Sequence, residues 1–62
     1  MGFETVTNYW VVRNQRGEVL GVVFGETTDD ARNAANEEFD RNGGYFMRRL
    51  AEGELSRYGI ER

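Results

Sequence analysis

The sequence predicts one α+β domain over residues 1–62 with the element order ββαβ. Its expected core is a three-stranded antiparallel sheet in the strand order 2-1-3 with one helix on one face. Three observations support this fold. A chain of 62 residues is too short to divide its apolar residues between two cores. Two segments rich in β-branched and aromatic residues flank a turn sequence, and a segment with helical apolar spacing follows them.

The first two strands are predicted at about 5–13 and 18–24, where TVTNYWVVR and EVLGVVF are typical strand sequences. Between them, NQRG has Asn14 at the first turn position and Gly17 where φ must be positive, which favours a type I turn closed by a G1 bulge. With Asn14 opposite Glu18, the apolar side chains of both strands gather on one face of the sheet. That predicted core face consists of Trp10, Val12, Leu20, Val22 and Phe24.

A helix is predicted at about 28–41, because its apolar residues fall at 31, 34, 35 and 39. Thr27 or Thr28 can cap its N-terminus, and Gly43 stands where a left-handed C-cap is expected. Three alanines on the buried side allow close approach to the sheet, where Trp10 and Phe24 would fill the space beneath the helix.

The third strand is predicted at about 45–50, with Phe46 and Leu50 on one face and Tyr45, Met47 and Arg49 on the other. A right-handed crossover through the helix places this strand beside the first one. Residues 52–58 have the composition of a short C-terminal helix that ends near Gly59.

The composition argues against catalysis, since the chain has no Cys, His or Lys. Ser56 is the only serine and has no basic side chain to activate it, and neighbouring carboxylates on a helix do not converge on a substrate. We therefore expect no enzyme activity, no metal site and no cofactor. The formal charge of −3 and the lack of an apolar run or a cationic leader predict a cytoplasmic protein with no membrane partner.

The face of the sheet opposite the helix is the predicted interaction surface. A single helix covers only one face, so an apolar and aromatic patch with two arginines at its rim would remain for another protein or for a second copy of the chain. The candidate contact residues are Tyr9, Val11, Arg13, Tyr45, Met47 and Arg49, on a face that would also carry Val19 and Val23. The alternative is that Leu55, Tyr58 and Ile60 fold under the sheet and cover this face.

Two further alternatives concern nucleic acids. Tyrosines beside arginines on an open sheet could stack the bases of a single strand, although the acidic balance of the chain makes this less favoured than protein binding. Conversely, the acidic helix could imitate a phosphate backbone and occupy a basic groove on another protein. The carboxylates concerned are Glu26, Asp29, Asp30, Glu37, Glu38 and Asp40.

The chain resembles small ββαβ proteins of phages and mobile elements, including some anti-CRISPR and related anti-defence proteins. The resemblance rests on 9–12 (YWVV), the 14–17 turn, the 18–24 strand, and Thr27 or Thr28 leading into Ala31 and 34–35. The 25–31 segment is also similar to the strand-to-helix step of HicB-type antitoxins, which have additional strand and a DNA-binding region. The resemblance implies a small inhibitor that binds a host protein, or an antitoxin-like regulator. We therefore predict a non-enzymatic protein-binding module that acts by surface recognition, with a homodimer as one expected form.

Overall fold

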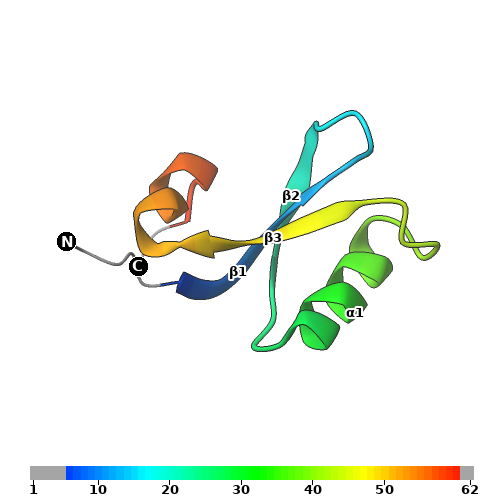
Figure 1. The fold of residues 1–62 in the computed structure, drawn as a ribbon, viewed down its shortest axis with the longest axis horizontal. Helices are drawn as coiled ribbons and strands as arrows, with labels where there is room; N and C mark the ends of the chain where they lie inside the picture. The colour runs from blue at the N-terminus through cyan, green and yellow to red at the C-terminus, as the bar shows by residue number, and fades with distance from the viewer. Residues whose placement is uncertain (1–5, 61–62) are drawn as a thin grey trace.

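The computed structural model describes residues 6–60 and has the predicted α+β fold (Figure 1). Its elements in chain order are β1 (Val6–Arg13), β2 (Val19–Phe24), α1 (Thr28–Glu38), β3 (Phe46–Ala51) and the 3-10 helix η1 (Glu52–Tyr58). Thr5, the predicted first residue of the first strand, lies outside the described residues.

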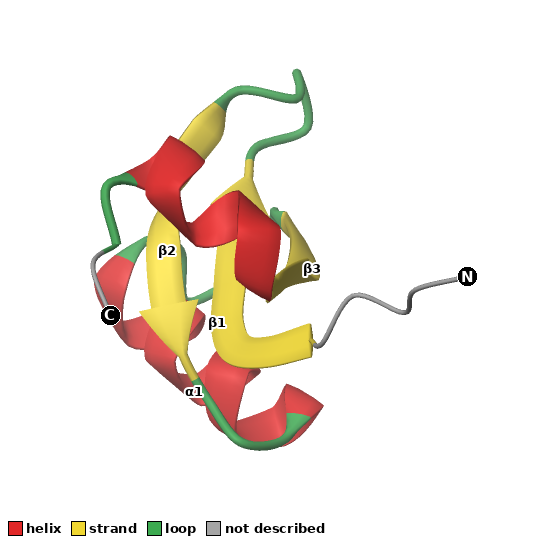
Figure 2. Ribbon diagram, turned by 90° about the vertical axis from the view of Figure 1, so that its left-hand side faces the viewer, coloured by secondary structure: helices red, strands yellow, loops and turns green. Residues whose placement is uncertain are grey.

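The three strands form one antiparallel sheet in the order β2-β1-β3, as predicted from the right-handed crossover. The sheet lies between the two helices, with α1 on one side and η1 on the other (Figures 1 and 2). We call these two sides the α1 face and the η1 face. Each has its own cluster of buried apolar side chains.

The turn between β1 and β2 has the predicted geometry. The Gly17 N–H donates to the Asn14 carbonyl at 3.0 Å, the Asn14 N–H donates to the Glu18 carbonyl at 2.9 Å, and Gly17 has a φ of 85°. The Asn14 side-chain oxygen also accepts the backbone N–H groups of Arg16 and Glu18. Because this turn is closed by local contacts, its sequence alone was sufficient to predict it.

Beyond the turn the predicted register of β2 is wrong by one residue. Arg13 pairs with Val19 as the turn requires, but Val12 then pairs with Gly21, so Leu20 is an extra residue in a β-bulge. The bulge exchanges the two faces of the rest of β2. Val23 therefore faces α1, whereas Val22 packs in the cluster on the η1 face. The predicted core residues Leu20 and Phe24 are exposed.

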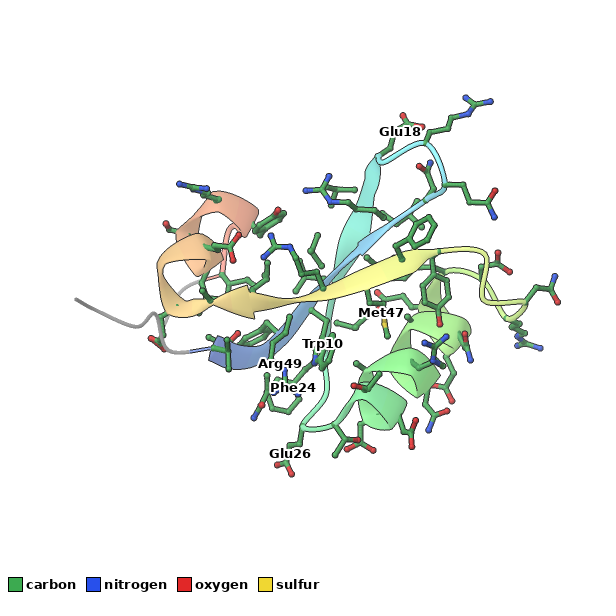
Figure 3. The ribbon with its side chains drawn as sticks, in the orientation of Figure 1. Trp10, Glu18, Phe24, Glu26, Met47 and Arg49 are labelled. Carbon is green, nitrogen blue, oxygen red and sulfur yellow. The ribbon has the colours of Figure 1, made fainter. Side chains whose placement is uncertain are left out.

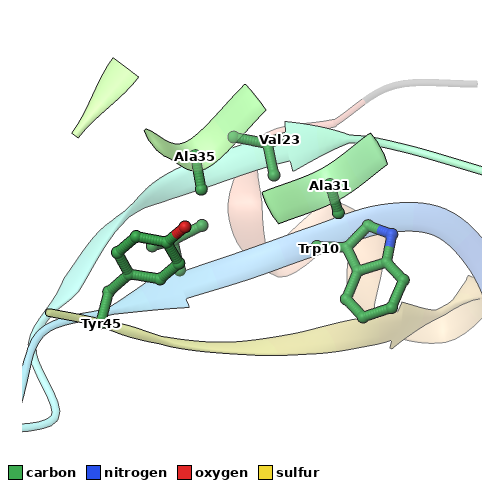
Figure 4. Close-up of a cluster of buried hydrophobic side chains, with 6 residues drawn as sticks. Trp10, Val23, Ala31, Ala35 and Tyr45 are labelled. Atoms are coloured by element: carbon green, nitrogen blue, oxygen red, sulfur yellow. The ribbon is translucent and has the colours of Figure 1, made fainter. Parts of the chain in front are cut away.

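The cluster on the α1 face joins large side chains of the sheet to small side chains of the helix (Figure 4). Its buried members are Trp10, Val12, Val23, Ala31, Ala35 and Tyr45. Phe39 takes the place that a side chain at Gly21 would occupy, because a Cβ atom there would lie 2.6 Å from the end of the Phe39 ring. The predicted match of small helix residues to large sheet residues is present, with Tyr45 in place of Phe24.

The helix α1 begins as predicted and ends earlier. Thr27 is the N-cap, and its side-chain oxygen accepts the Asp30 N–H at 3.1 Å. The helix stops at Glu38, not at 41, and Gly43 lies in the following loop. The Asp40 carboxylate accepts the N–H groups of Asn42 and Gly44, which gives the backbone an alternative to further helical bonds.

The third strand has its faces exchanged relative to the prediction. Met47 pairs with Val12 and Arg49 pairs with Trp10. Directly paired residues in an antiparallel sheet share a face, so both side chains lie on the α1 face. Leu50 instead joins Val11 and Leu55 in the cluster on the η1 face. The C-terminal segment thus folds under the sheet, which is the alternative given above for this face.

Candidate functional site

The six predicted contact residues do not form one surface. Three of them lie on the α1 face. Tyr45 and Met47 pack in the cluster there, and Arg49 lies over Trp10 (Figure 3). The other three predicted residues, Tyr9, Val11 and Arg13, belong to the η1 face through their contacts with its cluster or with Tyr58. The expectation of one shared open face is therefore wrong. It assumed that Tyr45, Met47 and Arg49 lie on the same face as Tyr9, whereas the pairing of β3 with β1 places them on the α1 face.

The residues on the α1 face are engaged in holding the fold. The Tyr45 hydroxyl donates to the Arg32 carbonyl at 3.2 Å and also to the Asn36 side-chain oxygen. The Arg49 guanidinium carbon lies 4.6 Å from the Trp10 ring centroid, and its Nη2 donates to the Glu26 carbonyl at 3.1 Å. Tyr9 and Tyr45 lie on opposite faces of the sheet, so they cannot form the single base-stacking platform that the nucleic-acid alternative requires.

The helix η1 covers the middle of its face. Val11 is buried between the strands and Leu55, and Tyr9, Val22, Tyr58 and Ile60 pack around this contact. The Tyr9 ring also meets the Phe24 ring edge-on, with the two centroids 5.3 Å apart. Phe24 itself is exposed, so η1 does not cover the β2 edge of the sheet at this residue.

An apolar surface remains open at the turn end of the same face. Arg13 pairs with Val19 on one side and with Phe46 on the other, so the three side chains form a row across all three strands. Phe46 is 65% exposed and Val19 is 46% exposed. We call these three residues, together with the adjoining Tyr58, the Arg13 row.

Arg13 is held in place by two acceptors. Its Nη1 donates to the Gly17 carbonyl at 2.9 Å, and its Nη2 donates to the Tyr58 hydroxyl at 3.2 Å. The guanidinium thus joins the turn to the end of η1 while its side chain stays half-buried between two exposed apolar neighbours. Arginine and aromatic side chains are enriched at protein interfaces, so Arg13 beside Phe46 has the composition of a contact surface.

Sequence reasoning found part of this surface. Arg13 and Val19 were both expected on the face opposite α1, where the structure places them. Phe46 was missed because the predicted β3 faces turned it toward the helix. The sequence held no signal for its face, because Arg48 and Arg49 are adjacent and place one charge on each face of the strand.

The acidic residues of the second alternative lie around α1. Glu26, Asp29, Asp30, Glu37 and Glu38 are exposed. Asp40 is different, because its two carboxylate oxygens accept the Asn42 N–H at 2.8 Å and the Gly44 N–H at 3.2 Å. Asp40 therefore shapes the loop that follows α1, and the acidic surface consists of the other five carboxylates.

One ion pair fixes the start of η1. The Arg48 guanidinium donates to both oxygens of the Glu54 carboxylate, at 2.9 Å and 2.7 Å. Glu54 also accepts the backbone N–H of Ala51 at 3.0 Å. These donors, Arg48 first and Ala51 second, lower the pKa of Glu54 from its usual 4.5 to about 2. The carboxylate therefore stays charged at every physiological pH.

The part of the chain that the structure describes has no pocket and no group of three acidic side chains able to hold a metal ion. Neither helix within residues 6–60 has the length and apolar character needed to cross a bilayer. Comparisons with models of protein families, with curated proteins and with solved structures gave no match.

Proposed function

We propose that this chain is a small protein-binding module without catalytic activity, and that the Arg13 row is the surface that contacts its partner. The single observation behind this proposal is the exposure of Phe46 and Val19 on either side of the anchored Arg13. A partner that covers Phe46 and Val19 would gain from their desolvation, and the Arg13 guanidinium could offer its remaining N–H groups to a carboxylate or a carbonyl.

The partner in this proposal is a host protein in the cytoplasm, and the chain is its phage or mobile-element inhibitor. The support for this narrower proposal is the resemblance of the sequence to small ββαβ anti-defence proteins, together with the ββαβ order of the chain. Inhibition by surface recognition also suits a domain of 62 residues that has no Cys, His or Lys. Such a module would act by occupying a surface that the host protein needs.

Affinity capture with matched variants tests the proposal. The full chain, Phe46→Ser and Val6→Ser are each immobilised and exposed to extract from the native host, and retained proteins are quantified. Val6 is a suitable control because it is 59% exposed, at the opposite end of β1 from Arg13. We expect a protein that the unchanged chain and Val6→Ser retain equally, and that Phe46→Ser binds about tenfold more weakly or worse.

Other outcomes would contradict this assignment. Retention that is unchanged in Phe46→Ser removes the Arg13 row as the contact surface. If the partner is lost only when Glu37 and Glu38 are both replaced by Arg, the contact lies on the acidic surface. Binding of a labelled oligonucleotide that weakens steeply with added salt assigns the chain to the nucleic-acid class. Circular dichroism of each variant shows whether a loss of binding is a loss of fold.

A further inference from the structure

Two arginines of the sheet lie on the η1 face, and they differ in the groups that accept their hydrogen bonds. Arg48 donates to both oxygens of the Glu54 carboxylate, at 2.9 Å and 2.7 Å. Arg13 donates to the Gly17 carbonyl and to the Tyr58 hydroxyl, and both of these acceptors are neutral. A guanidinium has more N–H groups than these two bonds use. Arg13 therefore keeps donors for a ligand, and neither of its acceptors compensates its charge.

The acidic side chains near this end of the sheet have other donors. Glu18, in the turn beside Arg13, accepts a hydrogen bond from the Asn14 side-chain amide at 3.1 Å. Glu54 is held by Arg48. The carboxylates of the acidic surface lie around α1, which covers the opposite face of the sheet (Figure 1). Within residues 6–60 the ion pair between Arg48 and Glu54 is the one that forms, so Arg13 has no carboxylate from this part of the chain.

A partner that covers Phe46 and Val19 also covers the guanidinium of Arg13, because the three side chains form one row. A charge that loses its solvent without gaining an opposite charge costs more free energy than a neutral polar group does. A backbone carbonyl of the partner would satisfy an N–H group and leave the charge uncompensated. A carboxylate accepts two N–H groups in one plane and also neutralises the charge. The row therefore favours a partner that brings a carboxylate.

We propose that the Arg13 row recognises an Asp or Glu side chain of the partner protein, with an apolar residue on each side of that acid. Phe46 and Val19 lie on opposite sides of Arg13, so the ligand needs apolar contacts on both sides of its carboxylate. A C-terminal carboxylate would supply such a contact on one side only. The inference rests on the proposed function, because it names the chemistry of the partner at the same surface.

A phosphorylated side chain fits this surface less well than a carboxylate. Proteins recognise phosphorylated residues with clusters of arginines, because the phosphoryl group has close to two negative charges and three acceptor oxygens. The second arginine of this face, Arg48, is already bound through both Nη atoms to Glu54. Arg13 alone matches the single charge and two oxygens of a carboxylate.

A displayed library of random peptides is the probe for this ligand. The full chain and Phe46→Ser are each immobilised, and the peptides that the full chain retains and Phe46→Ser loses are synthesised with amidated C-termini. We expect these peptides to contain Asp or Glu between apolar residues. Replacing that acid with its amide, Asp with Asn or Glu with Gln, should weaken binding to the full chain by about thirtyfold or more, as is typical when a desolvated charge pair is broken.

Variants of the chain show whether Arg13 is the group that reads the acid. On Arg13→Gln, the acidic peptide and its amide should bind within about threefold of each other, because the charge that distinguishes them is gone. Arg32→Gln is the matched control, since Arg32 is exposed on α1 and the same charge is lost there. It should keep the preference of about thirtyfold for the acid. Arg13→Lys should reduce that preference, because an ammonium lacks the planar pair of donors, and it serves if Arg13→Gln does not fold.

The failures of this inference and of the proposed function are distinct. Amide peptides that bind the full chain as well as the acidic ones overturn the carboxylate ligand, while their loss on Phe46→Ser still supports the Arg13 row. Tighter binding after the acid is replaced by phosphoserine also overturns it and assigns the row to phosphorylated partners. A preference for the acid that persists in both Arg13 variants removes Arg13 as its cause. Peptides that Phe46→Ser retains as well as the full chain does overturn the proposed function and this inference together.

Discussion

The α1 face and the η1 face of the sheet are covered in different ways. On the α1 face, a regular helix capped by Thr27 packs two buried alanines against Trp10 and Tyr45, and each aromatic ring also donates a hydrogen bond to a backbone carbonyl. On the η1 face, a 3-10 helix is held by one buried leucine, an ion pair and the hydrogen bond between Arg13 and Tyr58.

The two helices differ in how they are connected to the sheet. The helix α1 is joined to the sheet by loops at both ends, and its buried residues Ala31 and Ala35 pack in the cluster with Trp10 and Tyr45. The helix η1 continues directly from β3, and a 3-10 helix of seven residues has poorer hydrogen-bond geometry than an α-helix. We infer that the α1 face supports global stability and that η1 is the part of the fold that opens first.

Replacing Trp10 with Ala is expected to have the largest effect. The side chain is buried beneath α1, and its Nε1 donates to the Gly25 carbonyl at 2.8 Å. Truncation of a buried Trp costs about 3–5 kcal/mol, and a domain of this length has a total stability of roughly 3–9 kcal/mol. Urea unfolding followed by circular dichroism should show a mostly unfolded variant.

The control for this variant is Trp10→Phe, which keeps a ring and loses the bond to Gly25. It should cost about 1–2 kcal/mol and remain folded. If Trp10→Ala costs no more than a truncation beneath η1, the two faces contribute equally and the proposed contrast between them is wrong.

Replacing Leu55 with Ala should have a smaller and more local effect. Leu55 is the only η1 residue that is fully buried. We expect a cost of about 2–3 kcal/mol, because η1 can detach without unfolding the sheet. Trypsin provides a local readout, since Arg57 lies in η1 and Arg32 lies in α1.

In Leu55→Ala, cleavage after Arg57 should accelerate far more than cleavage after Arg32. The matched variant Ala31→Gly, on the buried side of α1, should accelerate both cleavages together. Equal acceleration at both arginines in Leu55→Ala would show that η1 and the α1 face unfold as one unit.

The sequence was sufficient to predict the elements that depend on local contacts. The Asn14 turn, the Thr27 cap and the alanine face of the helix are all determined within a few neighbouring residues. The strand order followed from one topological rule. These features are therefore present as predicted, although the helix ends earlier than its apolar spacing indicated.

The faces of β2 and β3 could not be predicted from their patterns. The sequence VLGVVF has no alternation of apolar and polar residues, so either register buries a similar set of side chains. Gly21 was the one available signal, because a glycine within a strand often marks a bulge or a close approach. Here it marks both: Leu20 forms the bulge, and the Phe39 ring packs where a side chain at 21 would lie.

The candidate site depends on these same faces. Arg13 and Val19 lie next to the turn, before the bulge, so their predicted face is correct. Phe46 lies in β3, opposite Arg13. Its face depends on the long-range pairing of β3 with β1, which no local pattern determines. The cover provided by η1 was an open alternative for a similar reason, since no local pattern determines whether a C-terminal segment packs against its own sheet.

Replacing Glu54 with Gln should have the smallest effect, and its dependence on pH distinguishes the ion pair from the apolar contacts of η1. The folded-state pKa of Glu54 is about 2, below its usual 4.5, so the charged carboxylate stabilises the fold fully above pH 4.5. That contribution is lost as the pH falls from 4.5 toward 2. Arg48 is more than half exposed, so the contribution is small.

Free energies of unfolding should therefore differ between the unchanged chain and Glu54→Gln at pH 7, and the difference should shrink as the pH falls from 4.5 toward 2. Arg48→Gln should remove most of the same pH dependence, because Arg48 is the main cause of the lowered pKa of Glu54. The hydrogen bond from the Ala51 N–H still lowers the pKa of Glu54 in this variant, so a smaller pH dependence should remain. A difference that stays constant down to pH 2 would mean that η1 is held by Leu55 and its apolar neighbours alone, which would make the two faces of the sheet more alike than we infer.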